Sequence, residues 1–203
     1  ATADDSVLRG IAVTGMANEG IHVTAARMVI DQNWFGVLTD GVTPSFHASE
    51  GVTLGNGADD TTLTDNHFGG LNFPAIRIAN PVTGTTIDSN WIGTDPTLAT
   101  NLGTSGIWSQ TTGTAVITDN VIANSLSHGI ETEGAGSTFT MLGNRIYASA
   151  GIGIDLDDGG GPVTLNDPGD GDAGPNGLLN FPVITATVPT GADTLVNYSV
   201  YLP

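Results

Sequence analysis

The feature that most constrains the fold is a short motif that recurs five times: Asn, one variable residue, then a bulky apolar residue. The copies are Asn33-Trp34-Phe35, Asn66-His67-Phe68, Asn90-Trp91-Ile92, Asn120-Val121-Ile122 and Asn144-Arg145-Ile146. Their asparagines are 33, 24, 30 and 24 residues apart. A unit this short cannot bury an apolar face alone, so its copies must stack on one another. The motif therefore predicts a solenoid.

Two further segments of alternating polarity accompany the Asn motif in most units, and period-two alternation is typical of strands with one buried face. One segment follows the motif: Gly20-Ile21-His22-Val23, Gly51-Val52-Thr53-Leu54, Ala75-Ile76-Arg77-Ile78, Gly106-Ile107-Trp108-Ser109, Gly129-Ile130-Glu131-Thr132 and Gly153-Ile154-Asp155-Leu156. The other precedes it, at residues 61–64, 85–88, 115–118 and 139–142. Three short strands per unit predict an all-β fold, a right-handed parallel β-helix of about six coils over residues 1–156.

The uneven spacing of the motif predicts that some coils carry inserted loops, at residues 38–50, 94–104 and 55–60. Such loops on one face of a solenoid often carry its specificity. The asparagines themselves are interpreted as turn residues, because Asn tolerates left-handed backbone conformations and forms local hydrogen bonds. Stacked at one corner, they are expected to form a hydrogen-bonded ladder.

The last part of the chain departs from the repeat. Residues 157–180 are rich in Asp, Gly and Pro, which predicts an ordered loop that caps the solenoid and a possible calcium site. Residues 181–203 alternate again but lack the Asn motif, which predicts a pair of antiparallel strands. We expect these strands to begin a following β-sandwich module.

The charge balance excludes some functions. Net charge is −17 although charged residues make up only 12%, because the chain has four arginines and no lysine. Such a chain has little means of holding a phosphate backbone, so no nucleic acid is expected as a partner. The negative field attracts cations instead, Ca²⁺ above all. There is no cysteine, and no apolar run approaches the length of a membrane span, so no membrane insertion is expected.

The repeats and the tail together resemble a known family. The tail motif runs Asn166-Asp167-Pro168-Gly169-Asp170, then Gly174-Pro175-Asn176 and Asn180-Phe181-Pro182-Val183. Over roughly residues 6–185 the chain resembles the right-handed parallel β-helix region, pectate-lyase-like in shape, of large bacterial secreted and surface proteins. The resemblance implies an extracellular setting and covalently linked neighbouring β modules in a longer parent chain. It implies no activity, because one fold hosts many functions.

Acidic residues give two candidate calcium sites. In the strands that follow the Asn motif, the residue between the two inward apolar residues faces outward, which predicts a column of His22, Thr53, Arg77, Trp108, Glu131 and Asp155. Carboxylates on adjacent coils repel one another unless a cation bridges them, and oxygen ligands suit Ca²⁺. The first site comprises Glu131, Glu133, Asp155, Asp157 and Asp158. The second comprises Asp167, Asp170 and Asp172 in the terminal loop. For both sites the alternative is an acidic surface without bound metal.

Three tryptophans, Trp34, Trp91 and Trp108, are candidate glycan contacts, because aromatic faces suit sugar rings. For Trp34 and Trp91 the alternative is that the inserted loops cover their rings. The pair Ser127-His128 lies in no recognisable triad context.

The favoured interpretation is a non-catalytic extracellular module for adhesion, presentation or contact with a polysaccharide or cell-surface glycan, stabilised by Ca²⁺. The alternative is a polysaccharide lyase or glycoside hydrolase that uses Arg77, Trp108, Glu131 and Asp155. A hydrolase needs two carboxyl groups within about 5–9.5 Å of each other.

Overall fold

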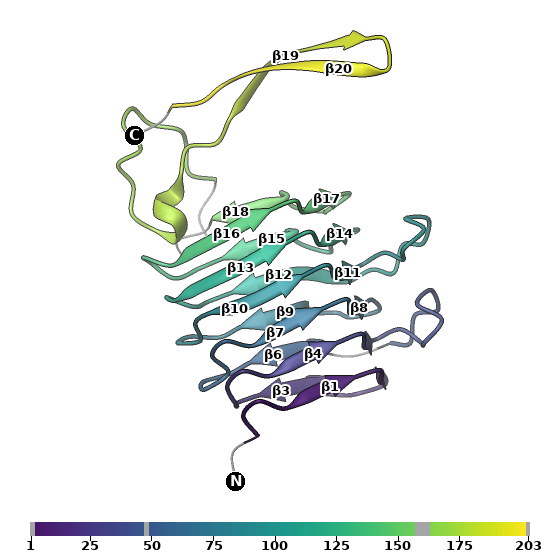
Figure 1. Ribbon diagram of the computed structural model, residues 1–203. Coiled ribbons are helices and arrows are strands. Elements are labelled where there is room, and N and C mark those ends of the chain that lie inside the picture. Colours follow the sequence, from purple (N-terminus) through teal and green to yellow (C-terminus); the bar gives the residue numbers. More distant parts are fainter. Residues whose placement is uncertain (1–2, 47–48, 157–162, 202–203) are drawn as a thin grey trace.

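The computed structural model describes residues 3–46, 49–156 and 163–201, and it is a stack of six coils (Figure 1). Each coil contributes one strand to each of three parallel sheets, so strands three positions apart in the chain are hydrogen-bonded neighbours. This confirms the predicted parallel β-helix with three strands per coil. The predicted antiparallel pair after the coils is also confirmed.

The strands of the coils are short. The first sheet contains β1 (Val7–Arg9), β4 (Val29–Asp31), β7 (Thr62–Thr64), β10 (Thr85–Asp88), β13 (Thr114–Thr118) and β16 (Thr138–Leu142). The second contains β2 (Ala12–Val13), β5 (Trp34–Phe35), β8 (His67–Phe68), β11 (Trp91–Ile92), β14 (Val121–Ala123) and β17 (Arg145–Tyr147). The third contains β3 (Ile21–Val23), β6 (Val52–Leu54), β9 (Pro74–Ile78), β12 (Ser105–Ser109), β15 (Ile130–Thr132) and β18 (Ile154–Leu156).

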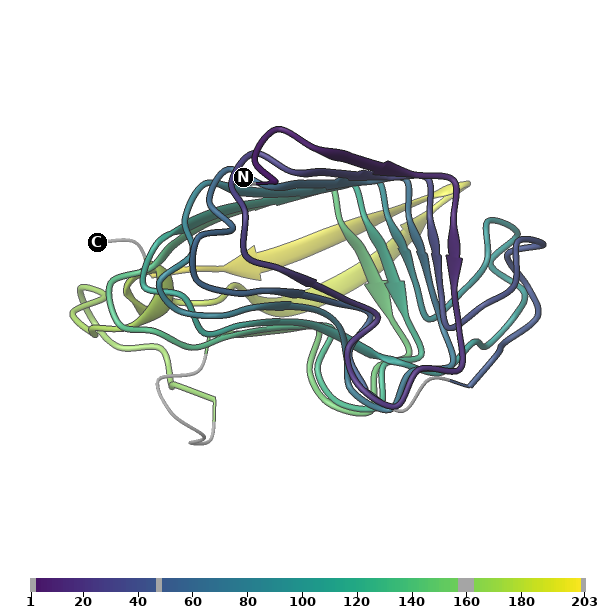
Figure 2. The same ribbon diagram turned by 90° about the horizontal axis from the view of Figure 1, so that it is seen from below.

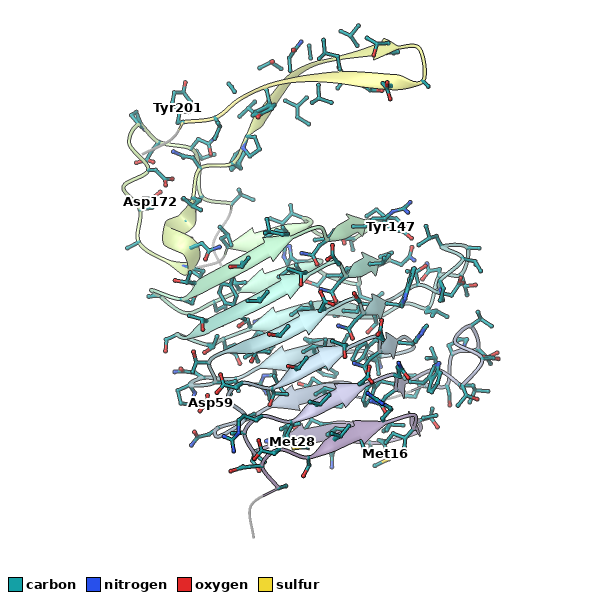
Figure 3. The ribbon with its side chains drawn as sticks, in the orientation of Figure 1. Met16, Met28, Asp59, Tyr147, Asp172 and Tyr201 are labelled. Carbon is teal, nitrogen blue, oxygen red and sulfur yellow. The ribbon has the colours of Figure 1, made fainter. Side chains whose placement is uncertain are left out.

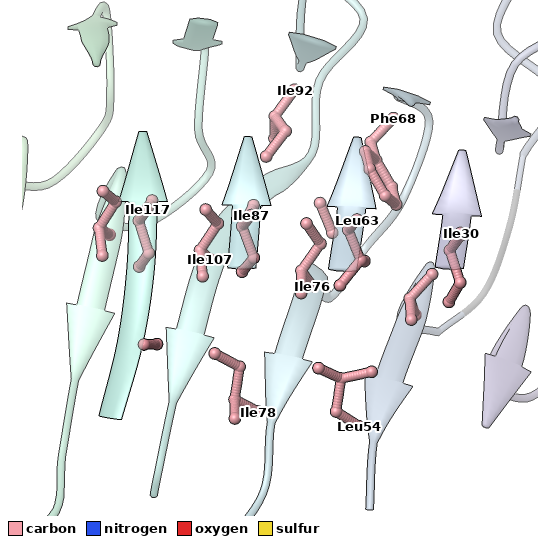
Figure 4. Close-up of a cluster of buried hydrophobic side chains, with 14 of the residues drawn as sticks. Ile30, Leu54, Leu63, Phe68, Ile76, Ile78, Ile87, Ile92, Ile107 and Ile117 are labelled. Carbon is pink, nitrogen blue, oxygen red and sulfur yellow. The ribbon is translucent and has the colours of Figure 1, made fainter. Parts of the chain in front are cut away.

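Apolar residues at equivalent positions of successive coils form a continuous core (Figure 4). The first sheet contributes a row of fully buried side chains, Ile30, Leu63, Ile87 and Ile117. Phe35 and Phe68 of the second sheet stack with ring centroids 4.9 Å apart. Because each row continues from coil to coil, every coil buries its apolar face on its neighbours.

The five asparagines form the predicted ladder inside the corner between the first and second sheets. The Nδ2 atoms of Asn33, Asn66 and Asn120 each donate to the Oδ1 atom of the next Asn at 3.0 Å, and that of Asn90 does so at 2.9 Å. The backbone N–H of each of these asparagines donates to the same oxygen. Asn33, Asn66, Asn90 and Asn120 are fully buried, so the ladder lies within the core.

The left-handed backbone at this corner lies one residue before the position we expected. The positive φ angles belong to the residues that precede the asparagines: Gln32, Asp65, Ser89, Asp119 and Gly143. Each Asn is therefore free to point its amide along the solenoid axis and bond to the next coil.

Two inserted loops leave the stack after β5 and after β11, and both project from the same side of the solenoid (Figure 2). Each folds back on itself through an antiparallel bridge, between Val37 and Pro44 in one loop and between Thr94 and Asn101 in the other. Within each loop an Asp side chain accepts hydrogen bonds from nearby threonines, Asp40 from Thr43 and Asp95 from Thr97 and Thr100.

The segment after the coils contains a 3₁₀ turn, η1 (Pro175–Leu178), and the hairpin of β19 (Val183–Thr190) and β20 (Asp193–Ser199). Asn176 of η1 pairs with the outer edge of β16, because its Oδ1 accepts from Phe139 N at 2.6 Å and its Nδ2 donates to Phe139 O at 3.0 Å. Every residue of β19 and β20 is exposed.

Candidate functional site

The outward column of the third sheet is in the register that the sequence predicts. The paired positions run His22, Thr53, Arg77, Trp108, Glu131 and Asp155 across six successive strands. Thr53 differs from the others because it is only 2% exposed. Its short side chain occupies the position between the longer side chains of His22 and Arg77 in this column.

A hydrogen-bonded network holds the Trp108 indole in place. Trp108 Nε1 donates to Glu133 Oε1 at 3.0 Å, and the Arg77 guanidinium lies 5.0 Å from the centre of the indole ring. Arg77 Nη2 donates to Gln110 Oε1 at 2.8 Å, and Gln110 Nε2 donates to Glu133 Oε2 at 3.3 Å. The four residues come from three adjacent coils, so the ring is fixed before any ligand arrives.

His128 and Asp155 form a second group next to Trp108 and Glu131. The backbone N–H of Ile152 donates to His128 Nδ1 at 3.2 Å, which leaves the proton of a neutral ring on Nε2. His128 Nε2 lies 3.5 Å from Asp155 Oδ2. Asp155 in turn occupies the position paired with Glu131 on the neighbouring strand. An imidazole and two carboxylates are thus gathered on two adjacent coils.

A cleft of about 250 Å³ opens between these groups and the turn that precedes β9. Its lining includes Asn72, Phe73, Trp108, Ser127, His128 and Glu131. Phe73 is 51% exposed, and Trp108 is half-buried, so two aromatic side chains flank polar groups that can donate and accept hydrogen bonds. Apolar walls with a few convergent polar groups are the usual make-up of a small-molecule site.

Four of these six cleft residues were not expected from the sequence. Asn72, Phe73, Ser127 and His128 lie two to four residues before a buried isoleucine of the third sheet, Ile76 or Ile130. Their shared place in the turn was a signal that could have identified them.

The tryptophans belong to two different surfaces. Trp34 and Trp91 lie in one outward column of the second sheet with His67 between them, whereas Trp108 lies on the third sheet. The Trp34 and His67 rings stack with centroids 5.9 Å apart. Burial lowers the pKa of His67, whose Nδ1 atom is buried and has no hydrogen-bond partner within the described part of the chain.

The inserted loop after β5 lies close to this second column. A side chain at Gly41 would come within 3.5 Å of His67 Nδ1 and 3.8 Å of Trp34 Nε1. Trp34 and Trp91 are both half-buried. The three tryptophans therefore do not form one binding face.

The expected calcium ligands that the structure describes lie in two separate parts of the molecule, around the third sheet and in the terminal segment. Among residues 3–46, 49–156 and 163–201, no three His, Cys, Asp or Glu side chains form a group that could hold a metal ion. Glu133 accepts from Trp108 and Gln110 as described above, and Asp157 and Asp158 lie outside the described residues. In the terminal segment, Asp170 Oδ1 accepts from Asn180 N at 2.6 Å, and Asp172 is exposed on the segment after the coils (Figure 3).

One family model matches the chain: the model described as "Right handed beta helix region" covers residues 19–168. No curated protein and no solved structure matches the chain in the other two comparisons. Within the described residues, no helix is long and apolar enough to cross a membrane.

Proposed function

The chain belongs to the right-handed β-helix family, and on that basis we propose that it is a non-catalytic extracellular module that binds glycans through the cleft beside Trp108. The observation that carries the proposal is the indole ring held by Glu133 and Arg77 at the wall of a 250 Å³ cleft. A ring fixed in advance loses little conformational entropy on binding, which favours contact with the flat face of a sugar.

The polar lining supports the same ligand class. Asn72, Ser127, His128 and Glu131 offer amide, hydroxyl, imidazole and carboxylate groups within one cleft. These are groups that exchange hydrogen bonds with hydroxyls in both directions. The cleft is smaller than the roughly 300–1,000 Å³ typical of sites for drug-sized ligands, so it suits one sugar unit of a longer chain.

Calorimetric titration of the protein with a panel of neutral and charged oligosaccharides tests the proposal. Trp108→Ala is expected to weaken binding roughly tenfold or more, the equivalent of about 1.4 kcal/mol. Phe46→Ala is the matched control, because Phe46 is 64% exposed and does not line the cleft. Equal affinity of the wild type and Trp108→Ala for every oligosaccharide, or no binding at all, would contradict the proposal.

A glycoside hydrolase is the second candidate. It is favoured by the paired positions of Glu131 and Asp155 on adjacent strands, which lie roughly 4.8 Å apart. Arg77, the base of the alternative lyase reading, is bonded to Gln110 and stacked on Trp108, and it does not line the cleft. Release of new reducing ends from an oligosaccharide that binds the wild type, lost in Glu131→Gln, would replace the binding proposal with this one.

Calcium stabilisation remains a separate proposal, for the terminal segment. It is supported by Asp167 Oδ1, a buried carboxylate oxygen that has no hydrogen-bond partner within the described residues. Native-state binding of Ca²⁺ must raise the midpoint of thermal unfolding. We therefore expect EDTA to lower the midpoint and added Ca²⁺ to restore it, and an identical midpoint in both buffers would remove calcium from the proposal.

A further inference from the structure

We infer that the cleft beside Trp108 selects saccharides that carry a protonated amine over those that carry a carboxylate. This inference rests on the proposed glycan binding and specifies its substrate class. It follows from where the few cations and many carboxylates of this chain lie relative to the cleft.

The chain has only four arginine and lysine side chains, each is engaged with another side chain, and none lines the cleft. Arg9 Nε lies 2.6 Å from Asp31 Oδ2, and Arg27 Nε lies 2.7 Å from Asp5 Oδ1. Arg145 lies over the Tyr147 ring at 5.3 Å, and Arg77 is held between Trp108 and Gln110. Among the residues that line the cleft, a uronate carboxylate would therefore find no guanidinium or ammonium group, and His128 is the one basic side chain there.

Carboxylates are concentrated at the same place. Glu131 lines the cleft, Asp155 lies behind it against His128, and Glu133 bonds to the Trp108 nitrogen. All three belong to β15 and β18 or the residue that follows β15, so they lie on two neighbouring coils. Together with the net charge of −17, they make the cleft attractive to a cation and repulsive to an anion.

The aromatic walls suit an ammonium group as well as a sugar face. Trp108 and Glu131 occupy paired positions on β12 and β15, so the indole and a carboxylate leave the same face of the sheet from neighbouring strands, whose backbones lie roughly 4.8 Å apart. An amine placed between them would contact the π face or edge region of an aromatic wall and a negative charge at once. Phe73 also lines the cleft and adds apolar contact for the carbon atoms of the sugar ring.

Two matched tetramers, of glucosamine and N-acetylglucosamine, and a third tetramer, of galacturonate, test the inference. They are titrated calorimetrically in buffer with EDTA, at a pH that protonates the amines. We expect the glucosamine tetramer to bind roughly tenfold more tightly than its N-acetylated counterpart, equivalent to about 1.4 kcal/mol. The galacturonate tetramer is expected to bind most weakly. Glu131→Gln should remove the preference for the amine, so that the glucosamine and N-acetylglucosamine tetramers bind the variant with similar affinity.

A charge control separates the cleft from the general negative field. Asp193→Asn removes one carboxylate on the exposed hairpin and should leave the preference unchanged. The inference is overturned if Glu131→Gln and Asp193→Asn reduce the preference for the glucosamine tetramer equally. It is also overturned if the galacturonate tetramer binds best. If the neutral and amino tetramers bind equally, selectivity is lost but glycan binding stands. If none of the three tetramers binds and no other oligosaccharide does, the proposed function itself fails.

Discussion

The coil stack and the C-terminal hairpin use β-structure in opposite ways. In the stack, strands of two to five residues are stable because each pairs with the next coil and packs on a shared core. In the hairpin, strands of eight and seven residues pair only with each other, and all of their residues are exposed. Isolated two-stranded hairpins are marginally stable in water. The stability of a strand therefore depends less on its length here than on how many of its sides pair with other strands or pack on the core.

The largest expected difference is in the response to loss of a leucine side chain. Leu63→Ala removes a fully buried side chain between Ile30 and Ile87 and should lower the free energy of unfolding by about 2–5 kcal/mol. Leu195→Ala in the hairpin, where Leu195 is 53% exposed, should change it by less than about 0.5 kcal/mol. Denaturant unfolding followed by circular dichroism measures both. Similar losses in the two variants would mean that the hairpin packs on the stack in solution.

The next largest effect is expected in the asparagine ladder. Asn90→Ala removes the oxygen that accepts from both Asn66 nitrogens, and each buried group left without a partner costs about 1–3 kcal/mol. Asn144→Ala is the matched variant, because Asn144 is half-buried at the last coil of the ladder and should cost less. The same unfolding experiment ranks them. A greater loss for Asn144→Ala would show that the last coil limits the stability of the stack.

A smaller, local effect is expected when acid opens the loop after β11. Hydrogen bonds from Thr100 and Thr97 lower the pKa of Asp95 to about 2, against about 3.9 in an unfolded chain. Because the folded pKa is lower, the carboxylate stabilises the loop above about pH 3.9, and this contribution is lost as the pH falls toward 2.

Fluorescence of Trp91, which lies in β11 just before this loop, or amide exchange at Thr97 and Thr100 should report the opening. Asp95→Asn should remove the pH dependence between these limits and leave the coils folded. If the wild type and Asp95→Asn both show a transition of the whole stack at the same pH, the opening is not confined to the loop after β11.

The smallest effect on the stack is expected from the hairpin turn. Gly191 has a φ of +69°, and Gly191→Ala would add a side chain in that left-handed conformation at about 1–2 kcal/mol. We expect faster amide exchange in β19 and β20 only, with the exchange of coil amides unchanged. A change in the amide exchange of the coils of this variant, in either direction, would show that the stability of the stack depends on the hairpin.

Much of the fold could be predicted from the sequence because the repeat sets a register. Once Asn66 and Asn90 are equivalent, His67 and Trp91 must lie side by side, and the structure has them paired. The same argument placed Trp108 next to Glu131. Inside a strand, period-two alternation decides which side chains face outward.

The turns could not be predicted in the same way, and most of what was missed lies there. The direction of His128 depends on a hydrogen bond from Ile152, which is 24 residues away and has no counterpart in the local sequence. The left-handed residue at the ladder corner can be Gln, Asp, Ser or Gly, so composition does not mark it. Phe73, in the turn before β9, contributes to the cleft because the stacking of the coils brings it into the same lining as Trp108.

The asparagine ladder also gives the solenoid a direction. All four Asn-to-Asn side-chain bonds run the same way, from the amide nitrogen of one coil to the amide oxygen of the next. Aligned amide dipoles polarise one another, so each bond strengthens its neighbours. A coil without Asn within the series would interrupt it. The backbone N–H and the Nδ2 atom of the preceding Asn would then lack the amide oxygen that accepts from them. The first coil has Ile11 at this position and gives only its backbone N–H to Asn33 Oδ1. A coil without Asn can therefore begin the series, whereas a coil inserted within it must bring its own amide.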